Sequence, residues 1–408
     1  MDLYFGYTMN KNMLLYTNDF HSHIPESLST LNQMFTLKKE SLIVDTGDFS
    51  EGHAFYTLFG GEPEKMLISK IYDVIAPGNH GFQNLIELNQ KKFPIINCHL
   101  LYNGSLLFKP DWVSQLGKYK LGFVGLMSKE SFLSIEVKYR KYLEYIDPKE
   151  SLPKIVQLLK QKTDFIILLS HSGFENDKVL AKKYDGVDVI ISGHCHSENT
   201  EIVLNDTLIV KAPELGTGFG KLTFSDTLIK HNIIRNQRIK INENRIDFLN
   251  PYLIQYDSTN SNELFFVSLS FSSNYCTRKK LMDYLVEQIC LENDSDLCII
   301  NFHCLRGVLP HGGVTLTMLM NYMPFNTTLV KCSINRDLLN DYLGILPKDI
   351  KDYLCISPNS NTQSEFLCII TTEYLMSNYF KPICSSKEKE ITSLIDYVIN
   401  HFSQDGNL

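Results

Sequence analysis

Short apolar runs alternate with amphipathic segments over roughly the first 240 residues of the chain. Helical spacing is clearest at residues 148–161, where Asp147 precedes as the N-terminal cap and Pro148 takes the first helical position. This alternation predicts a layered α/β domain in which helices flank a sheet. The runs with strand character are residues 13–17, 41–45, 74–76, 94–97, 120–125, 165–170 and 187–192.

The hydrophobic pattern changes near residue 200. Between about 200 and 240 it fits short alternating strands with Gly216, Gly218 and Gly220 at turns, which predicts an antiparallel edge to the first domain. Residues 242–262 are polar and contain Pro251, so we expect a linker there. A smaller α+β unit follows, with strands expected at 264–271, 297–301 and 327–334 and helices at 278–291 and 387–402. The sequence thus predicts a first domain over 1–241, a linker over 242–262 and a second domain over 263–408.

Composition narrows the class of protein. A chain of 408 residues with 44% hydrophobic content can bury more than one core, because single cores stop growing at roughly 250–300 residues. The net charge of −7 argues against a nucleic-acid polymer as partner. No apolar run approaches the ~20 residues of a membrane span, and residues 1–10 lack the pattern of a secretion signal. The ten cysteines, without CxxC pairs, are expected to be buried thiols, with disulfides as the alternative. We therefore expect a cytoplasmic protein without a membrane partner, and the sequence leaves its oligomeric state open.

Polar residues with metal-binding chemistry follow several of the predicted strands. The strand at 187–192 ends in Gly193-His194-Cys195-His196, which brings two imidazoles to one rim. Neutral imidazole is the commonest metal ligand in proteins. Each cluster alone has an ordinary interpretation as a turn or a hydrogen-bonded histidine, but their joint order predicts one composite metal centre. The other clusters are Asp19-Phe20-His21, Gly47-Asp48, Gly78-Asn79-His80 and Ser170-His171.

The set of ligands suits two divalent ions that share a carboxylate. Asp48 is the residue expected to bridge them, and mixed nitrogen and oxygen ligands without thiolate favour zinc, manganese or iron over calcium. Two such ions clamp the attacking and leaving oxygens of an in-line displacement. The predicted division is Asp19, His21, Asp48 and His196 for one ion, and Asp48, Asn79, His171 and His194 for the other.

The ordered clusters resemble those of the calcineurin-like metallophosphoesterases, and their context resembles the 5′-nucleotidase branch of that superfamily. The resemblance implies an α/β fold with a four-layer α-β-β-α metallophosphoesterase domain, followed by a smaller α+β C-terminal substrate-binding domain. It also implies two divalent metal ions and hydrolysis of phosphate esters. By this resemblance Asp48 and His80 are catalytic, His80 as an acid or oxyanion stabiliser that is not itself a ligand.

The resemblance extends more weakly to substrate binding in the second domain. It implies that Asn301 and Arg306 contact a nucleotide and that Phe325 and Phe380 sandwich its base. Aromatic stacking suits this role because every base has a π-face. The residues alone leave open that both rings belong to the core and that Arg306 is a structural surface cation.

The chain departs from the family pattern after His80. The family follows Gly-Asn-His with Glu and a nearby Asp that orients the catalytic histidine, whereas this chain reads Gly81-Phe82-Gln83. A neutral amide can still accept a hydrogen bond from the ring but stabilises its cation less, so we expect reduced or narrowed activity. Changes near the substrate residues, at His303, Asn274 and residues 377–379, further suggest a modified pocket.

The favoured function is therefore a dinuclear metal-dependent phosphomonoesterase acting on a 5′-nucleotide or nucleoside-like phosphate, with a small phosphorylated molecule as partner. One alternative is a phosphodiesterase or nucleotide-sugar hydrolase on the same metal centre. The other is a catalytically weakened binding module that only holds metal.

Overall fold

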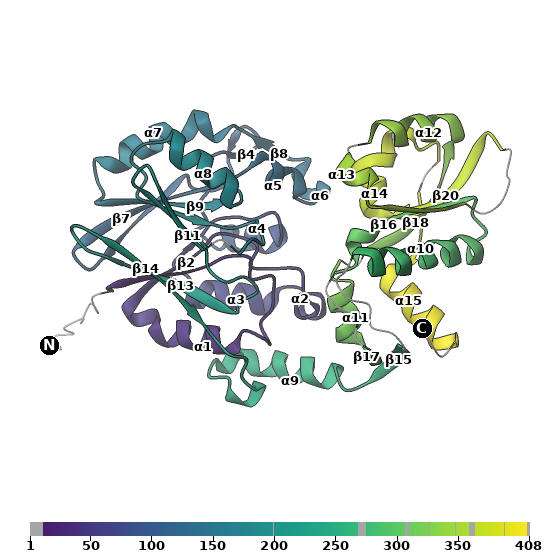
Figure 1. Ribbon diagram of the computed structural model, residues 1–408, viewed down its shortest axis with the longest axis horizontal. Helices are drawn as coiled ribbons and strands as arrows, with labels where there is room; N and C mark the ends of the chain where they lie inside the picture. Colours follow the sequence, from purple (N-terminus) through teal and green to yellow (C-terminus); the bar gives the residue numbers. More distant parts are fainter. Residues whose placement is uncertain are drawn as a thin grey trace. The chain divides into compact units, whose positions relative to one another are not determined.

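The computed structural model of the chain divides into two compact units (Figure 1). The first comprises residues up to Glu51 and Leu58–Ile254, and the second comprises Gly52–Thr57 and Gln255–Leu408. Asn274 and residues 268–271 of an expected strand lie outside the described residues. The structure describes residues 11–198, 200–267, 275–306, 309, 311–325, 327–346, 348–358, 364–386 and 388–405.

The first unit contains two mixed β-sheets. The first sheet has the order β14-β13-β1-β2-β3. In it β1, β2 and β3 are parallel, β13 is antiparallel to β1, and β14 is antiparallel to β13. Its strands are β1 (Met13–Thr17), β2 (Ser41–Asp45), β3 (Val74–Ile75), β13 (Gly218–Phe224) and β14 (Ile229–Arg235).

The second sheet has the order β11-β12-β10-β9-β7-β6, in which the four central strands are parallel and both edge strands are antiparallel. Its strands are β6 (Asp111–Leu116), β7 (Tyr119–Met127), β9 (Phe165–His171), β10 (Val189–Ser192), β11 (Glu201–Leu204) and β12 (Thr207–Val210).

The two sheets pack face to face around one apolar core. Leu14 and Tyr16 of β1 lie in the same buried cluster as Ile167 and Leu169 of β9. The side chains on the other face of the second sheet pack against helices α7 (Pro148–Lys160) and α8 (Phe174–Lys183). Helices α1 (Leu28–Leu37) and α3 (Glu62–Ile71) cover the outer face of the first sheet (Figure 1). The first unit therefore has the four layers α-β-β-α, and strands buried on both faces explain the continuous apolar runs.

The strand predictions for this unit hold with one exception. Residues 94–97 form isolated bridges to Ile75 and Lys109 rather than a strand, because Pro94 has no N–H and offers only its carbonyl oxygen to Ile75. The predicted strands between 200 and 240 are present, but they do not form one edge. β11 and β12 extend the second sheet, and β13 and β14 extend the first.

The second unit is a smaller α+β structure built on a five-stranded sheet with the order β19-β16-β20-β18-β21. Helices α10 (Tyr275–Glu292) and α15 (Leu394–Asp405) pack on one face, and α12 (Arg336–Ile345) and α14 (Glu373–Leu375) on the other. A pair of strands, β15 (Glu263–Val267) and β17 (Gly312–Thr315), forms a separate small sheet. The five strands are β16 (Leu297–Asn301), β18 (Thr328–Asn335), β19 (Leu354–Pro358), β20 (Phe366–Thr372) and β21 (Lys389–Ser393).

One local prediction for the second half of the chain needs correction. The helix expected over 387–402 begins only at Leu394, because Lys389–Ser393 pairs with β18 as strand β21. The segment expected to be a polar linker contains helix α9 (Asn250–Thr259). Pro251 lies in the first turn of α9, where its missing N–H disturbs no helical hydrogen bond.

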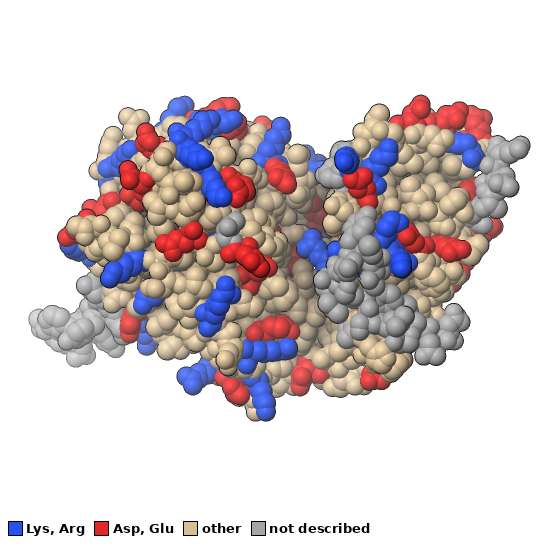
Figure 2. Space-filling view, in the orientation of Figure 1, with Lys and Arg blue, Asp and Glu red and all other residues tan. Residues whose placement is uncertain are grey.

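The surface carries charges of both signs. On the face in Figure 2, basic and acidic side chains are interspersed over both units. Within the described part of the chain, no helix combines the length and the apolar character needed to cross a bilayer.

Candidate metal centre

The predicted ligands lie at the carboxyl ends of neighbouring parallel strands from both sheets. In the first sheet they follow β1, β2 and β3, and in the second they end β9 or follow β10. Since the two sheets pack face to face, these loops meet at one rim. The residues in this position are Asp19, His21, Asp48, Asn79, His171, His194 and His196.

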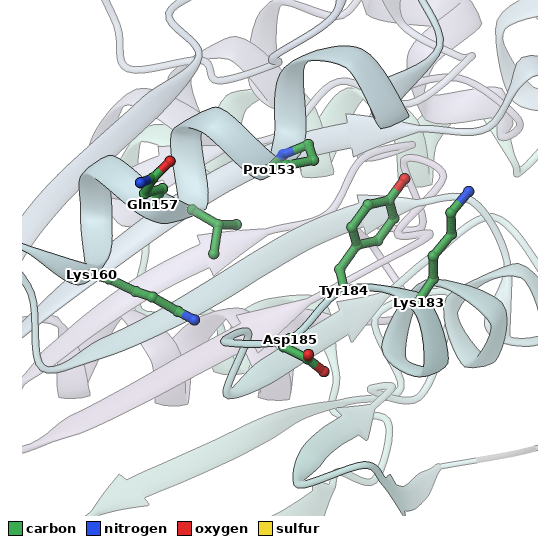
Figure 3. A pocket seen from close by; sticks show the side chains of 7 residues that line it. Pro153, Gln157, Lys160, Lys183, Tyr184 and Asp185 are labelled. Carbon is green, nitrogen blue, oxygen red and sulfur yellow. The ribbon is translucent and has the colours of Figure 1, made fainter.

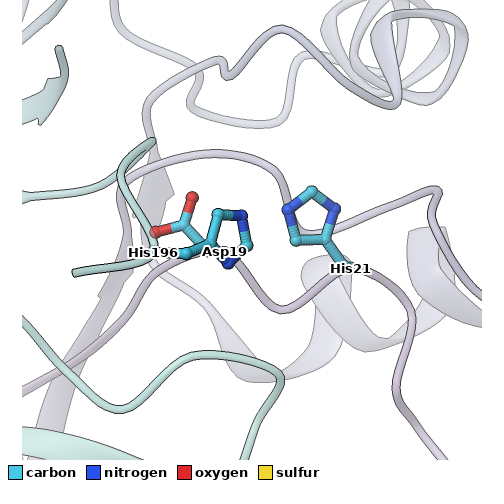
Figure 4. Close-up of side chains that lie close together, drawn as sticks. All are labelled: Asp19, His21 and His196. Carbon is cyan, nitrogen blue, oxygen red and sulfur yellow. The ribbon is translucent and has the colours of Figure 1, made fainter. Parts of the chain in front are cut away.

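One group joins Asp19, His21 and His196, whose ligand atoms all lie within 4.8 Å of one another. All three side chains extend from loops (Figure 4). The rings of His21 and His196 are stacked, with centroids 5.4 Å apart. Asp19 and His21 are buried, whereas His196 is exposed, so this group opens toward solvent.

The second group joins Asp48, His171 and His194, again with ligand atoms within 4.8 Å of one another. The side-chain oxygen of Asn79 lies 3.2 Å from His171 Nε2 and 3.1 Å from His194 Nδ1. Asp48 Oδ2 lies 3.2 Å from His171 Nε2 and 3.8 Å from His21 Nε2. The carboxylate of Asp48 therefore stands between the two groups, where it can bridge two ions.

Four of these residues have a left-handed backbone, with φ of 48° at Asp19, 48° at His21, 55° at Asp48 and 78° at His194. Non-glycine residues rarely adopt this region, and it persists where surrounding bonds enforce it. Hydrogen bonds between the loops do so here: Asp19 N–H donates to Gly47 O and His21 N–H to Asp48 O, at 3.1 and 2.9 Å. His194 N–H donates to Asp19 Oδ1 at 2.9 Å.

Two glycines allow the loops to approach one another this closely. A Cβ on Gly78 would lie 2.0 Å from Asp48 Oδ1, and one on Gly47 would lie 2.8 Å from His171 Nδ1. Gly47 also has a φ of +102°, which L side chains rarely adopt. The glycines of Gly47-Asp48 and Gly78-Asn79 are therefore required by packing around the candidate ligands.

Electrostatics hold the ligands in a state suited to a cation. Burial lowers the pKa of His21 well below its ordinary value and that of His194 to about 4, so both rings are neutral at pH 7. Burial alone would raise the pKa of Asp48, but the charges of His171 and His80 outweigh it and hold that pKa well below the usual range. Burial alone would lower the pKa of His171, but the Asp48 carboxylate raises it to about 9. The centre thus favours positive charge next to Asp48.

The donor set fits a pair of divalent metal ions. His21 Nε2 is buried and makes no hydrogen bond within the part of the chain that the structure describes. An unpartnered buried polar atom costs about 1–3 kcal/mol, and a metal–nitrogen bond would remove that cost. The oxygen and nitrogen donors suit zinc, manganese or iron. Cys195 is not among them, because its Sγ accepts a hydrogen bond from Phe174 N–H at 3.1 Å.

In three of the histidines, the ring nitrogen Nδ1 contacts an oxygen atom of a residue outside the candidate ligand set. His171 Nδ1 lies 2.8 Å from the carbonyl oxygen of Thr46, and His21 Nδ1 lies 3.2 Å from that of Glu51. His196 Nδ1 forms an ion pair with Glu214 at 2.6 Å. Such partners fix the orientation of metal-binding rings. Sequence reasoning missed Glu214, because this residue belongs to none of the strand-end clusters.

His80 lies at the edge of the centre, and Gln83 does not orient it. The ring of His80 is 5.3 Å from that of His21, and its backbone N–H donates to Asp48 Oδ1 at 2.8 Å. The amide of Gln83 instead accepts from Tyr139 Oη at 3.0 Å and donates to Glu87 at 2.8 Å. The hydrogen bond that the Gln83 amide could have accepted from the His80 ring is therefore not made in the structure.

In the second unit, two of the four predicted substrate residues lie together. The guanidinium of Arg306 lies over the ring of Phe325, 4.8 Å from its centroid. Asn301 ends β16, and its side chain accepts a hydrogen bond from His303 N–H at 2.8 Å, which caps the following turn.

Phe380 is fully buried in the core of the second unit, among residues such as Ile369 and Leu339. A ring without an exposed face cannot stack on a base, so its predicted role is corrected to that of a core residue. The same segment carries Tyr374, which is 49% exposed, with its ring 6.3 Å from that of Tyr379.

A surface cavity of ≈ 210 Å³ lies between α7 and the end of α8 (Figure 3). None of the predicted site residues lines it. Its lining consists of Pro153, Val156, Gln157, Lys160, Lys183, Tyr184 and Asp185.

Comparison with known proteins identifies relatives of both the sequence and the fold. Residues 13–198 match the calcineurin-like phosphoesterase family. A 5′-nucleotidase of Mus musculus is 32% identical over 218 residues, which cover 45% of this chain and 38% of the mouse protein. The match therefore spans well under half of that relative's length.

Two solved structures share the fold over nearly the whole chain. A 5′-nucleotidase precursor from Thermus thermophilus has a TM-score of 0.78 at 17% identity, and the match covers 97% of each chain. A putative 5′-nucleotidase from Staphylococcus aureus has a TM-score of 0.72 at 15% identity, again over 97% of each chain. At these identities the likeness shows the fold alone, and that fold includes both units.

Proposed function

Residues 13–198 match the calcineurin-like phosphoesterase family, and from this match we propose that the chain is a metal-dependent hydrolase of phosphate monoesters. The observation that carries the proposal is the position of Asp48, whose Oδ2 lies 3.8 Å from His21 Nε2 and 3.2 Å from His171 Nε2. A carboxylate between two groups of Asp and His donors is the arrangement that a pair of ions needs.

In this proposal each ion has its own set of side chains. Asp19, His21 and His196 would hold one, Asn79, His171 and His194 would hold the other, and Asp48 would contact both. When bound, the two ions would supply Lewis acidity toward phosphoryl oxygens and lower the pKa of water. Burial of Asp19 and His171 excludes solvent from the inner side of the centre.

His80 is the proposed catalytic side chain beside the ions. It offers a ring nitrogen within 4.8 Å of donor atoms of His21 and Asp48, which is near enough to contact the same phosphoryl group. In the proposal the ring, in its protonated form, donates a hydrogen bond to an equatorial or departing oxygen of that group, a contribution of the kind supplied by oxyanion donors.

The proposed substrate is a 5′-nucleotide or a nucleoside-like phosphate, with the first unit as catalytic domain and the second as substrate-binding domain. The Arg306–Phe325 pair supports this choice, since it combines a cation for an anionic group with an aromatic face. The match to a mouse protein named as a 5′-nucleotidase supports the same substrate class. A cytoplasmic location is also proposed, and buried free thiols such as Cys98 and Cys298 support it.

Phosphate release tests the proposal. The purified protein, loaded with manganese, zinc or iron, is expected to hydrolyse p-nitrophenyl phosphate and AMP, with activity lost in Asp48→Asn and His196→Ala. Cyclic nucleotides and nucleotide sugars in the same panel distinguish the phosphodiesterase alternative. Bound metal without hydrolysis of any of these esters would leave the metal-holding binding module as the function.

A further inference from the structure

The histidine proposed to act on the phosphoryl group has a carboxylate partner at a different place in the sequence from the one expected. Gln83 is engaged by Tyr139 and Glu87. Glu51, from the loop after β2, approaches His80 instead, and its Oε2 lies 3.3 Å from His80 Nδ1. The side chains of His80 and Glu51 are 20% and 25% exposed, so a substrate can reach the ring.

The backbone of Glu51 is fixed from two sides. Its N–H donates to Ser22 Oγ at 3.0 Å, and its carbonyl oxygen lies 3.2 Å from Nδ1 of His21. Its φ of 70° is in the left-handed region, which indicates that these neighbours enforce its conformation. Next to it, Ser50 Oγ accepts a hydrogen bond from the Asn84 amide at 3.0 Å. The carboxylate of Glu51 therefore extends from a well-held loop.

Lys138 is the cation that could compete with His80 for the carboxylate of Glu51. Lys138 is close enough for the charge of Glu51 to act on it, but its ammonium group forms an ion pair with Glu136 at 2.9 Å. Among the described residues, the side chain that lies within hydrogen-bonding distance of the Glu51 carboxylate is His80.

We propose that Glu51 is the positioning residue for His80, in place of the carboxylate that Gln83 lacks. By accepting a hydrogen bond from Nδ1–H it fixes the ring orientation and the tautomer, and leaves Nε2 to face the phosphoryl group. The tautomer of a neutral imidazole is set by the partner of its other nitrogen. The expected effect of Glu51 on turnover rests on the proposed hydrolase function, but the Glu51–His80 contact can be tested without that function.

The first test reads the ring directly in metal-free protein. In ¹⁵N-histidine NMR spectra, with His80 assigned from the signal lost in His80→Gln, the ring is expected in the Nδ1–H tautomer. Glu51→Ala should shift it to a mixture of tautomers, and Glu51→Gln, which keeps an acceptor oxygen, should restore part of the original signal. An unchanged His80 signal in Glu51→Ala would overturn the inference.

The second test reads turnover of the manganese-loaded protein on p-nitrophenyl phosphate. Loss of a partner that orients a metal-binding ring lowers activity by about 10–100-fold, and we expect a loss of similar size for a ring beside the ions. Glu51→Ala should therefore lower kcat by about 10–100-fold with KM changed by less than about threefold, and Glu51→Gln should recover part of the kcat. Glu292→Ala is the matched control, because it removes a carboxylate that pairs with a histidine, His401, within the second unit.

Metal analysis and the parent protein separate the remaining explanations. A kcat loss accompanied by loss of bound metal would mean that Glu51 acts by holding His21, which contradicts the inference. If the parent releases no phosphate, the proposed function fails, and the NMR result alone decides whether Glu51 positions His80.

Discussion

Replacing Gly78 with alanine puts a methyl group where the carboxylate of Asp48 now lies. The added Cβ would be 2.0 Å from Asp48 Oδ1 and 2.4 Å from Asp48 N. Real Cβ contacts essentially never fall under 3.0 Å, so residue 78 and the carboxylate of Asp48 must separate by at least 3.0 − 2.0 = 1.0 Å. The same separation acts on the hydrogen bond from His80 N–H to Asp48 Oδ1, which is 2.8 Å long.

A displacement of this size is large for a bridging carboxylate. A misplacement of about 1 Å in an active site can lower the rate by about 100-fold. We therefore expect Gly78→Ala to lower kcat on p-nitrophenyl phosphate by at least about 100-fold. It should also bind less than the parent's stoichiometric amount of manganese, measured by equilibrium dialysis and elemental analysis.

The matched control is a glycine-to-alanine substitution at a position where the added methyl group contacts no neighbouring atom. Gly344 lies in α12, and nothing lies within 4 Å of a Cβ built on it. Gly344→Ala should leave metal binding and turnover unchanged and raise the free energy of unfolding by up to about 1 kcal/mol. Parent-like metal content and turnover in Gly78→Ala would refute the view that Asp48 bridges the two groups.

Three further results are expected. Asp48→Asn should lower the pKa of His171 from about 9 in metal-free protein, followed by histidine NMR, because the carboxylate charge is what raises it against burial. His99 is buried, which lowers its pKa from 6.5 to about 4, and its Nε2 accepts a hydrogen bond from Met127 N–H. The free energy of unfolding should therefore fall as the pH drops from 6.5 to 4. The loss is up to roughly 3 kcal/mol, at about 1.4 kcal/mol for each pKa unit of the shift. His99→Gln should show a shallower dependence of unfolding free energy on pH in urea titrations. Phe380→Ala should destabilise the protein by about 3–5 kcal/mol in the same titrations, with an unchanged KM for AMP, whereas a KM change without destabilisation would restore its stacking role.

The strand-end clusters were predictable because burial on both faces leaves a clear pattern. β1, β2 and β16 have the bounds expected from their apolar runs, and each buried parallel strand ends where polar residues begin. Once two such sheets pack together, residues that follow the strands meet at one rim. Local sequence therefore indicated which ligand residues would converge, although they are far apart along the chain.

The partners of the histidines in the candidate site were not predictable in the same way. Glu51 and Glu214 follow no periodic pattern, and their contacts with His80 and His196 join loops 29 and 18 residues apart. The role of Phe380 was inferred from the resemblance of its segment to a family segment, which does not indicate which ring of the segment is exposed. Residues Met376–Phe380 form a π-helical turn, and Phe380 packs in the core.

The geometry of the loops also bears on the choice between a hydrolase and a weakened module that only holds metal. Asp19, His21, Asp48 and His194 all adopt positive φ, and each such position costs roughly 1 kcal/mol or more. Weak ion binding by exposed carboxylates and imidazoles requires no such conformation, because ordinary turns present those groups equally well. In these strained loops the carboxylate of Asp48 lies between the two groups of candidate ligands, and His80 lies beside them. A centre that must hold reacting atoms within about 0.5 Å needs such preorganisation, and the strain therefore favours the hydrolase.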